Sequence, residues 1–113
     1  MGLKNMIFAD IHCHALYGVD DGARDEAMMQ KMLDAQYVDG VRYLCFTPHY
    51  HPGYYGYNEI GTEAAFNRAV EYCKKYPNLQ LSLSNELHYA PECLSWIKTK
   101  TCRKISSTKY ILV

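Results

Sequence analysis

The sequence predicts an α/β fold built on a parallel sheet, of either the doubly wound or the barrel type. Apolar, strand-like segments alternate along the chain with segments whose apolar residues recur at helical spacing. Strands that alternate with helices pair in parallel through right-handed crossovers. A length of 113 residues suits one domain or a piece of one, with a single hydrophobic core. No linker, repeat or low-complexity segment divides the chain.

The first half of the chain predicts a strand, a helix and a second strand. Residues 6–11 form an apolar run that indicates a short buried strand. Residues 24–39 have acidic residues in the first turn and are followed by Gly40, which predicts a helix with a defined end. Its core-facing residues are expected to be Met28, Met29, Met32, Leu33 and Tyr37. Residues 41–47 are rich in β-branched and aromatic residues, which predicts a second buried strand, and a loop is expected to begin at His49.

The second half continues the alternation. Residues 62–76 predict a helix that is ended by a Pro-Asn pair. Leucines alternate with polar residues over 79–83, which predicts a third strand that ends just before Glu86. A short helix that is anchored by Trp96 is expected next. Residues 110–113 predict a fourth strand.

The charge balance and the cysteines limit the functional class. Lys plus Arg and Asp plus Glu are equal at 12 each, and no run of like charge occurs. Neither a nucleic-acid partner nor an anionic membrane surface is therefore expected. The five cysteines form no C-x-x-C pair and follow no leader of the secretory type. They are predicted to be reduced thiols in a soluble, cytoplasmic protein that is not embedded in a membrane.

Side chains with metal-ligand chemistry follow the predicted strands. The run Asp10-Ile11-His12-Cys13-His14 comes at the end of the first strand, His49 after the second and Glu86 after the third. Ligands of parallel α/β folds collect at the carboxyl ends of the strands. Nitrogen and carboxylate ligands together suit Mn, Fe or Zn, and a carboxylate such as Glu86 can bridge two ions. Two ions about 3.5 to 4 Å apart would form a clamp for displacement at phosphorus.

The histidine pair has expected partners. His12 and His14 are two residues apart, so on a strand their side chains lie on the same face and can coordinate one ion. Asp10 lies one pleat earlier and is expected to accept the second ring N–H of a histidine. Asp21 is a further candidate ligand. The sequence Asp-Asp-Gly around it is also good turn chemistry, and Asp21 could instead cap the following helix.

The remaining candidates are weaker. Cys13 points away from the histidine pair on a strand and is expected to pack in the core. No cysteine is followed six positions later by the arginine of a cysteine-dependent phosphatase. His51 is expected either at the surface or in contact with a metal ligand without binding the metal itself. His88 is expected at the surface. The tyrosine-rich segment 49–57 is a candidate wall over the site, although tyrosine and glycine are also ordinary loop residues.

The motifs in combination resemble one superfamily. The chain contains D-I-H-C-H-x-L-x-G-x-D-D-G, then T-P-H-Y, then N-E-L-x-Y. This combination is similar to the polymerase and histidinol phosphatase (PHP) superfamily. The D-D-G and T-P-H-Y segments resemble in particular its bacterial manganese-dependent tyrosine-protein phosphatases of capsule and exopolysaccharide loci. The resemblance spans essentially the whole chain.

The resemblance implies a metal site and an activity. It makes His12 and His14 ligands of one metal and Glu86 the bridging carboxylate. It makes Asp21 and His49 ligands of a further metal. Family members use a cluster of three ions, for which Mn²⁺ is expected here and Fe or Zn are alternatives. They hydrolyse phosphotyrosine with metal-activated water, on the tail of a bacterial tyrosine autokinase that controls polysaccharide polymerisation and export.

The resemblance also implies a distorted (β/α)7 barrel, of which this chain would supply strands one to four. Residues 1–113 are then expected to be the N-terminal part of a single PHP domain that stops within or just after the fourth strand. Family members carry further metal ligands beyond this point, so this chain alone is expected to hydrolyse phosphotyrosine poorly. Two alternatives stay open. One is a non-catalytic remnant or interaction module with a partial metal site, and the other is a different H-x-H metal hydrolase.

Overall fold

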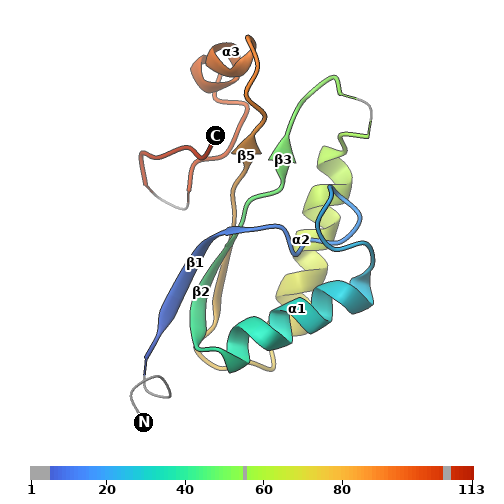
Figure 1. Ribbon diagram of the computed structural model, residues 1–113, viewed down its shortest axis with the longest axis vertical. Helices are drawn as coiled ribbons and strands as arrows, with labels where there is room; N and C mark the ends of the chain where they lie inside the picture. The colour runs from blue at the N-terminus through green and yellow to red at the C-terminus, as the bar shows by residue number, and fades with distance from the viewer. Residues whose placement is uncertain (1–5, 55, 106–107) are drawn as a thin grey trace.

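The computed structural model describes residues 6–54, 56–105 and 108–113 (Figure 1). Strands and helices alternate along these residues. The strands are β1 (Phe8–Cys13), β2 (Val41–Phe46), β3 (His49–Tyr50), β4 (Gln80–Leu83) and β5 (Glu86–Leu87). The helices are α1 (Glu26–Val38), α2 (Glu59–Cys73) and α3 (Cys93–Lys98).

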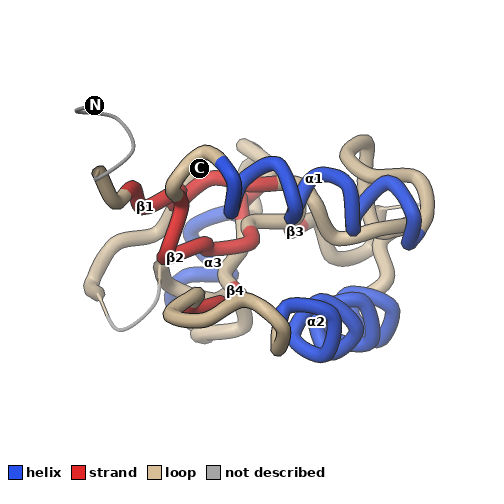
Figure 2. Tube along the Cα trace, turned by 90° about the horizontal axis from the view of Figure 1, so that it is seen from below, coloured by secondary structure: helices blue, strands red, loops and turns tan. Residues whose placement is uncertain are grey.

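The strands form two parallel sheets. The larger sheet has the strand order β1-β2-β4, and the smaller one pairs β3 with β5. The order of the larger sheet advances in one direction, so right-handed crossovers place α1 and α2 on the same face. Figures 1 and 2 show both helices on one side of this sheet. The predicted α/β fold with parallel pairing is confirmed.

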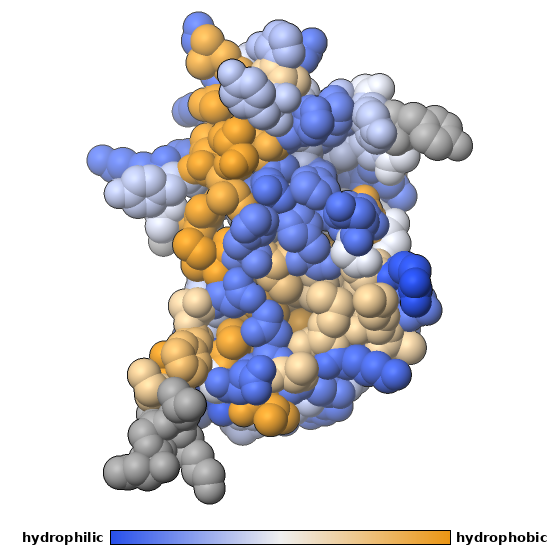
Figure 3. All heavy atoms as spheres, viewed as in Figure 1, coloured by the Kyte–Doolittle hydropathy of each residue, from blue (hydrophilic) through white to orange (hydrophobic). Residues whose placement is uncertain are grey.

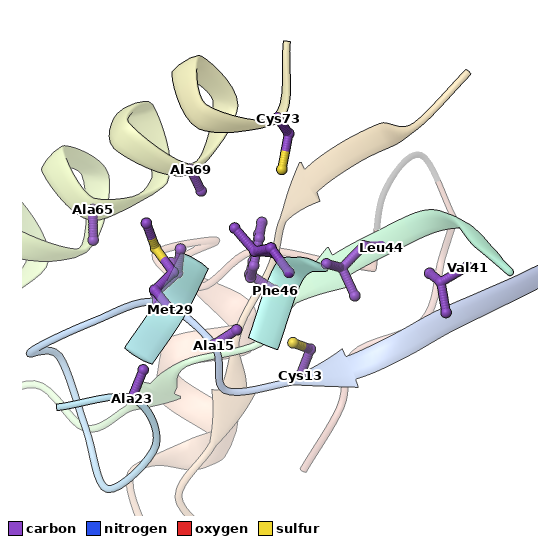
Figure 4. Close-up of a cluster of buried hydrophobic side chains, with 12 residues drawn as sticks. Cys13, Ala15, Ala23, Met29, Val41, Leu44, Phe46, Ala65, Ala69 and Cys73 are labelled. Atoms are coloured by element: carbon purple, nitrogen blue, oxygen red, sulfur yellow. The ribbon is translucent and has the colours of Figure 1, made fainter. Parts of the chain in front are cut away.

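The hydrophobic core lies between the larger sheet and the two long helices (Figure 4). Leu44 and Phe46 of the central strand β2 are fully buried, as are Met29 of α1 and Ala69 of α2. The ring of Phe46 meets Phe66 of α2 edge to face, with centroids 5.9 Å apart. The core therefore fixes β2, and with it the end of the sheet from which the candidate ligands emerge.

Side-chain caps set where the two long helices begin. Asp25 accepts a hydrogen bond from the backbone N–H of Met28 at 2.8 Å, and Asn58 accepts one from Gly61 at 2.9 Å. The first helix agrees closely with its predicted range. The second begins at Glu59, earlier than predicted, because the cap rather than the apolar pattern determines its first turn.

Two predictions of core packing are wrong. Met28 is 37% exposed whereas Met29 beside it is buried, because neighbouring side chains on a helix point about 100° apart. The first strand lies further along the chain than predicted, and most of its residues are exposed. Ile7 and Ile11 are 76% and 51% exposed. Among the described residues, only β2 pairs with β1, so β1 is an edge strand rather than a buried one.

The fourth strand predicted at residues 110–113 is reduced to a single bridge. Leu112 pairs in parallel with Glu86, and the N–H of Leu87 donates to the Leu112 carbonyl at 2.9 Å. The direction of pairing agrees with the prediction, but the extent does not, because the rest of this segment makes no ladder with β5.

Figure 3 shows a band of hydrophobic residues along the side of the molecule on which β1 and the C-terminal segment lie.

Two further predictions concern the state of the cysteines and the presence of a membrane-spanning helix. All five thiols are free. Cys13 is 6% exposed and packs in the core as predicted, and its burial raises the pKa of its thiol to about 11. Within the part of the chain that the structure describes, no helix combines the length and the apolar character that crossing a bilayer requires.

Candidate metal centre

The candidate ligands emerge where the parallel strands end. Just after β2 ends, one more backbone hydrogen bond joins the chain to β1: the N–H of Thr47 donates to the Cys13 carbonyl at 2.8 Å. His14 follows directly. β3 and β5 then pair with His49 opposite Glu86, and adjacent strands are only about 4.8 Å apart. The prediction of a loop from His49 is therefore wrong, and the added strand pair sets His49 directly opposite Glu86.

The carboxylate of Glu86 lies at the centre of three imidazoles. Its Oε1 is 3.2 Å from His12 Nε2, 2.9 Å from His14 Nε2 and 3.3 Å from His49 Nδ1. The Nε2 atoms of His12 and His14 are 3.1 Å apart. Two ring nitrogens this close need a proton or a cation between them, because their lone pairs repel each other. Four of the five predicted ligands thus meet at one point.

These distances fit the coordination of one ion. The two Nε2 atoms and Glu86 Oε1 form a triangle with edges of 2.9, 3.1 and 3.2 Å. Ligand atoms that bind one ion at about 2.0 to 2.2 Å lie roughly 2.9 to 3.5 Å from one another. Imidazole nitrogen with carboxylate oxygen is a donor set that Mn, Fe and Zn accept. His12, His14 and Glu86 could hold a divalent ion with little rearrangement.

Asp20 orients the His14 ring. Its Oδ2 is 2.9 Å from His14 Nδ1 and accepts the backbone N–H of His49 at 3.2 Å, while Oδ1 accepts the N–H of Gly22 at 2.9 Å. The Asp20 side chain is only 5% exposed. A carboxylate that accepts one ring N–H leaves the other nitrogen free to bind a metal. Asp20 therefore directs His14 Nε2 towards Glu86.

The prediction that Asp10 has this orienting role is wrong. Its carboxylate accepts a hydrogen bond from Gln36 Nε2 of α1 at 2.7 Å and one from the backbone N–H of His12 at 3.0 Å. The register of β1 is irregular between Asp10 and Cys13, so the simple alternation of faces does not hold there. The Asp-Asp-Gly triplet was the available signal for Asp20, but the sequence alone does not distinguish its two aspartates.

Asp21 lies at the outer side of the cluster. Its Oδ1 is 3.2 Å from His49 Nε2, and its side chain is 84% exposed. The alternative role as a helix cap is taken by Asp25 instead. A second group of potential ligand atoms, from His14, Asp20, Asp21 and His49, lies within 4.8 Å of one another.

His51 and His88 lie beside the centre rather than in it. Their rings stack with centroids 4.1 Å apart, and His51 also stacks with Tyr54 at 4.6 Å. His88 is exposed, as predicted, and His51 is partly exposed. Within the tyrosine-rich segment, Tyr55 lies outside the described residues. The pairing of these two histidines has no signal in the sequence, because they are 37 positions apart.

Several known proteins are similar to this chain over most of its length. The model of the family described as capsular polysaccharide synthesis, CpsB/CapC, matches residues 8–113. The chain belongs to this family. Tyrosine-protein phosphatase CpsB of Streptococcus agalactiae is 29% identical over 105 residues, and tyrosine-protein phosphatase YwqE of Bacillus subtilis is 31% identical over 105 residues.

Each of these alignments covers 92% of this CpsB/CapC chain, but only 43% of the S. agalactiae protein and 41% of YwqE. The chain therefore spans less than half the length of the curated relatives. A solved chain from the crystal structures of YwqE from B. subtilis and CpsB from Streptococcus pneumoniae, described as unique metal-dependent tyrosine phosphatases, has a TM-score of 0.78 and 29% identity. That match covers 93% of this chain and 43% of the solved one.

The contact between His14 and Asp20 shifts both pKa values. The hydrogen bond that His14 donates to the Asp20 carboxylate raises the pKa of His14 above its usual 6.5, against an opposing effect of burial. Burial acts to raise the pKa of Asp20, but hydrogen bonds from His14 and two backbone N–H groups outweigh it and hold that pKa below 3.8. In the metal-free chain, the contribution of the His14–Asp20 pair to the free energy of unfolding is greatest between about pH 4 and 6.5. That stability is lost above the raised pKa of His14 and below the lowered pKa of Asp20.

Asp20→Asn is expected to lower the pKa of His14 in the metal-free chain. The substitution removes the charged acceptor and leaves the burial of the ring, which disfavours the imidazolium. Histidine ring NMR signals followed through a pH titration measure the change. Asp10→Asn is the matched control, because Asp10 bonds to Gln36 and not to His14. An unchanged His14 pKa in Asp20→Asn would contradict the assignment.

Gly22→Ala is expected to weaken Mn²⁺ binding roughly 10-fold or more, within the range for groups that support metal ligands. A Cβ at this position would overlap the carbonyl oxygen of His14 and lie 2.7 Å from its Cβ, so the turn must move away from His14. Calorimetric titration with Mn²⁺ measures the loss. At Gly18, whose φ is +71°, a Cβ would meet no atom within 4 Å, so Gly18→Ala tests backbone strain in the same turn without the overlap and should lose less affinity than Gly22→Ala. Equal affinities in both variants would exclude a role for this close approach.

Proposed function

We propose that this chain carries part of the active site of a metal-dependent protein-tyrosine phosphatase. The observation that carries the proposal is the convergence of three imidazoles on the carboxylate of Glu86 at the ends of parallel strands. The names of the relatives CpsB and YwqE, and the description of the matched crystal structures as metal-dependent tyrosine phosphatases, support the reaction class.

The proposed metal ligands are His12, His14, Asp21, His49 and Glu86. His12 and His14 would hold one ion, Asp21 and His49 a further ion, and Glu86 would bridge between them. Mn²⁺ is the proposed cation, with Fe or Zn as alternatives that the same donors accept. When bound, such cations supply Lewis-acid activation of a phosphate ester and of water.

The proposed substrate is phosphotyrosine in the tail of a bacterial tyrosine autokinase that regulates polysaccharide synthesis. Membership of a capsular polysaccharide synthesis family supports this setting. The acidic side chains of Asp20 and Asp21 beside the histidines would repel a phosphate in the absence of cations. We therefore expect phosphate to bind only together with the metal.

We further propose that residues 1–113 are the N-terminal part of a single PHP-type (β/α)7 barrel. The strand order advances in one direction with both helices on one face, as in a barrel rather than a doubly wound sheet. The exposed apolar residues Ile11 of β1 and Ile7 just before it fit a surface that the rest of a protein of the relatives' length would cover.

The test is to titrate the purified chain with Mn²⁺ and Zn²⁺ by calorimetry and then to assay a phosphotyrosine peptide. We expect divalent-ion binding that is lost in His14→Ala, together with poor turnover. Failure to bind any divalent ion would remove the enzymatic proposal. Robust turnover that disappears in His14→Ala would support the phosphatase and contradict the expectation that this chain alone is a poor enzyme.

A further inference from the structure

A cavity of about 460 Å³ opens beside the candidate metal centre. One part of its wall consists of groups near the proposed ions and another part of aromatic rings. The lining residues that matter here are Asp20, Asp21, His49, His51, Tyr54 and His88. The cavity is therefore lined on one part by the proposed cation-binding residues and on another by rings that could contact a flat, apolar group.

The aromatic part of the wall is a stack of three rings. His51 lies nearly parallel to His88, at 8° and 4.1 Å between centroids, and nearly parallel to Tyr54, at 13° and 4.6 Å. Trp96 of α3 meets His51 edge-on at 6.0 Å and Tyr50 at 5.4 Å. Tyr50 is 5% exposed, so α3 and β3 support the stack from the interior.

The outer end of the stack faces the cavity and solvent. Tyr54 is 62% exposed although it lines the cavity, so much of its ring has no protein partner. An aromatic surface in a cavity that also contains a few convergent polar groups is the usual composition of a small-molecule site. None of the three stacked rings belongs to the ligand groups His14, Asp20, Asp21, His49 or His12, His14, Glu86.

We propose that Tyr54, His51 and His88 form the subsite for the aromatic ring of an aryl phosphate, and that Tyr54 is a specificity-determining residue. The phosphate would lie towards His49 and Asp21, and the ring of the substrate would stack against Tyr54. The inference rests on the proposed function, since it needs cations to hold the phosphate. It adds the means by which the site favours phosphotyrosine over an alkyl phosphate such as phosphoserine.

The experiment measures binding of three probes to the chain in the presence of Mn²⁺: inorganic phosphate, ethyl phosphate and phenyl phosphate. Calorimetry gives each Kd, and the fluorescence of Trp96, the single tryptophan of the chain, reports on the stack. Phenyl phosphate should bind roughly 3- to 10-fold more tightly than ethyl phosphate, as expected for one aromatic stacking contact. Only phenyl phosphate should change the Trp96 emission.

Substitutions at Tyr54 separate stacking from other causes. Tyr54→Ala should remove most of the preference for phenyl phosphate, and Tyr54→Phe should retain it because the ring is kept. Tyr89→Ala is the control, since Tyr89 is 86% exposed and does not line the cavity. Folding is not at risk, because the Tyr54 ring is mostly exposed.

The outcomes are distinct. Equal affinities for the two esters, or a preference that survives Tyr54→Ala, overturn the subsite; if inorganic phosphate still binds with Mn²⁺, the proposed function stands. Failure of all three probes to bind overturns the subsite and the proposed phosphate site together. A preference that is lost in Tyr54→Ala and kept in Tyr54→Phe and Tyr89→Ala supports the subsite.

Discussion

Glu86→Gln is expected to reduce the affinity of the chain for Mn²⁺ by about 100-fold or more, at or beyond the upper limit for groups that only support metal ligands. The wild-type carboxylate oxygen lies within 3.3 Å of nitrogen atoms from three histidines. Glutamine keeps the size of the side chain but replaces an anionic ligand with a neutral amide. The three imidazoles would then converge on a group that neither balances the charge of a cation nor binds it strongly.

Calorimetric titration of Mn²⁺ into both proteins measures the effect. Glu92→Gln is the matched control, because Glu92 is an exposed residue before α3 whose side chain makes no cap hydrogen bond. It should leave the affinity unchanged. An affinity of Glu86→Gln within about 3-fold of wild type, less than 1 kcal/mol, would show that Glu86 is not a ligand.

The candidate ligands that could be placed together from the sequence are those whose position depends on local pattern. His12 and His14 follow an apolar run, and His49 and Glu86 follow segments that read as strands. Parallel pairing then brings strand ends to one edge without further information. The added pairing of β3 with β5 only tightened this arrangement, by setting His49 opposite Glu86.

Asp20 could not be distinguished from Asp10 or Asp21, because its role depends on how the chain folds back after β1. The N–H of Ala23 donates to the His14 carbonyl at 3.1 Å, and the N–H of Gly18 donates to the Ala23 carbonyl at 2.9 Å. These bonds return Asp20 to the ring of His14. No periodicity encodes such a turn, whereas the alternation that pointed to Asp10 fails at an irregular strand register.

The exposure of β1 and the stacking of His51 on His88 both depend on contacts between segments that are far apart in the sequence. An apolar run such as residues 6–11 reads as buried, but burial depends on whether a second neighbour covers the strand. His51 and His88 stack because β3 and β5 lie side by side, and the N–H of His88 donates to the Tyr50 carbonyl at 3.1 Å. Contacts between distant segments decide both features, so the sequence pattern alone does not reveal them.

Phe46→Ala is expected to lower the free energy of unfolding by about 3 to 5 kcal/mol. Phe46 is fully buried in the central strand, among the largest enclosed side chains, and packs edge to face on Phe66. Removal of the ring loses its transfer free energy and leaves a cavity between the sheet and α2. Urea unfolding measures the change as a lower midpoint with an unchanged slope. Ile60→Ala, at an 83% exposed position, should stay within about 0.5 kcal/mol of wild type.

The same variant distinguishes an effect on folding from an effect on the metal centre. A domain of this kind has roughly 5 to 15 kcal/mol of stability, so loss of 3 to 5 kcal/mol can populate unfolded chains in which His14, His49 and Glu86 are no longer together. The proposed ligands are together only in the folded form, so excess Mn²⁺ should raise the urea midpoint of Phe46→Ala by as much as it raises that of wild type. It should raise the midpoint of Glu86→Gln hardly at all. A Phe46→Ala protein that is stable but insensitive to Mn²⁺ would mean that the core, and not only the ligands, sets the geometry of the centre.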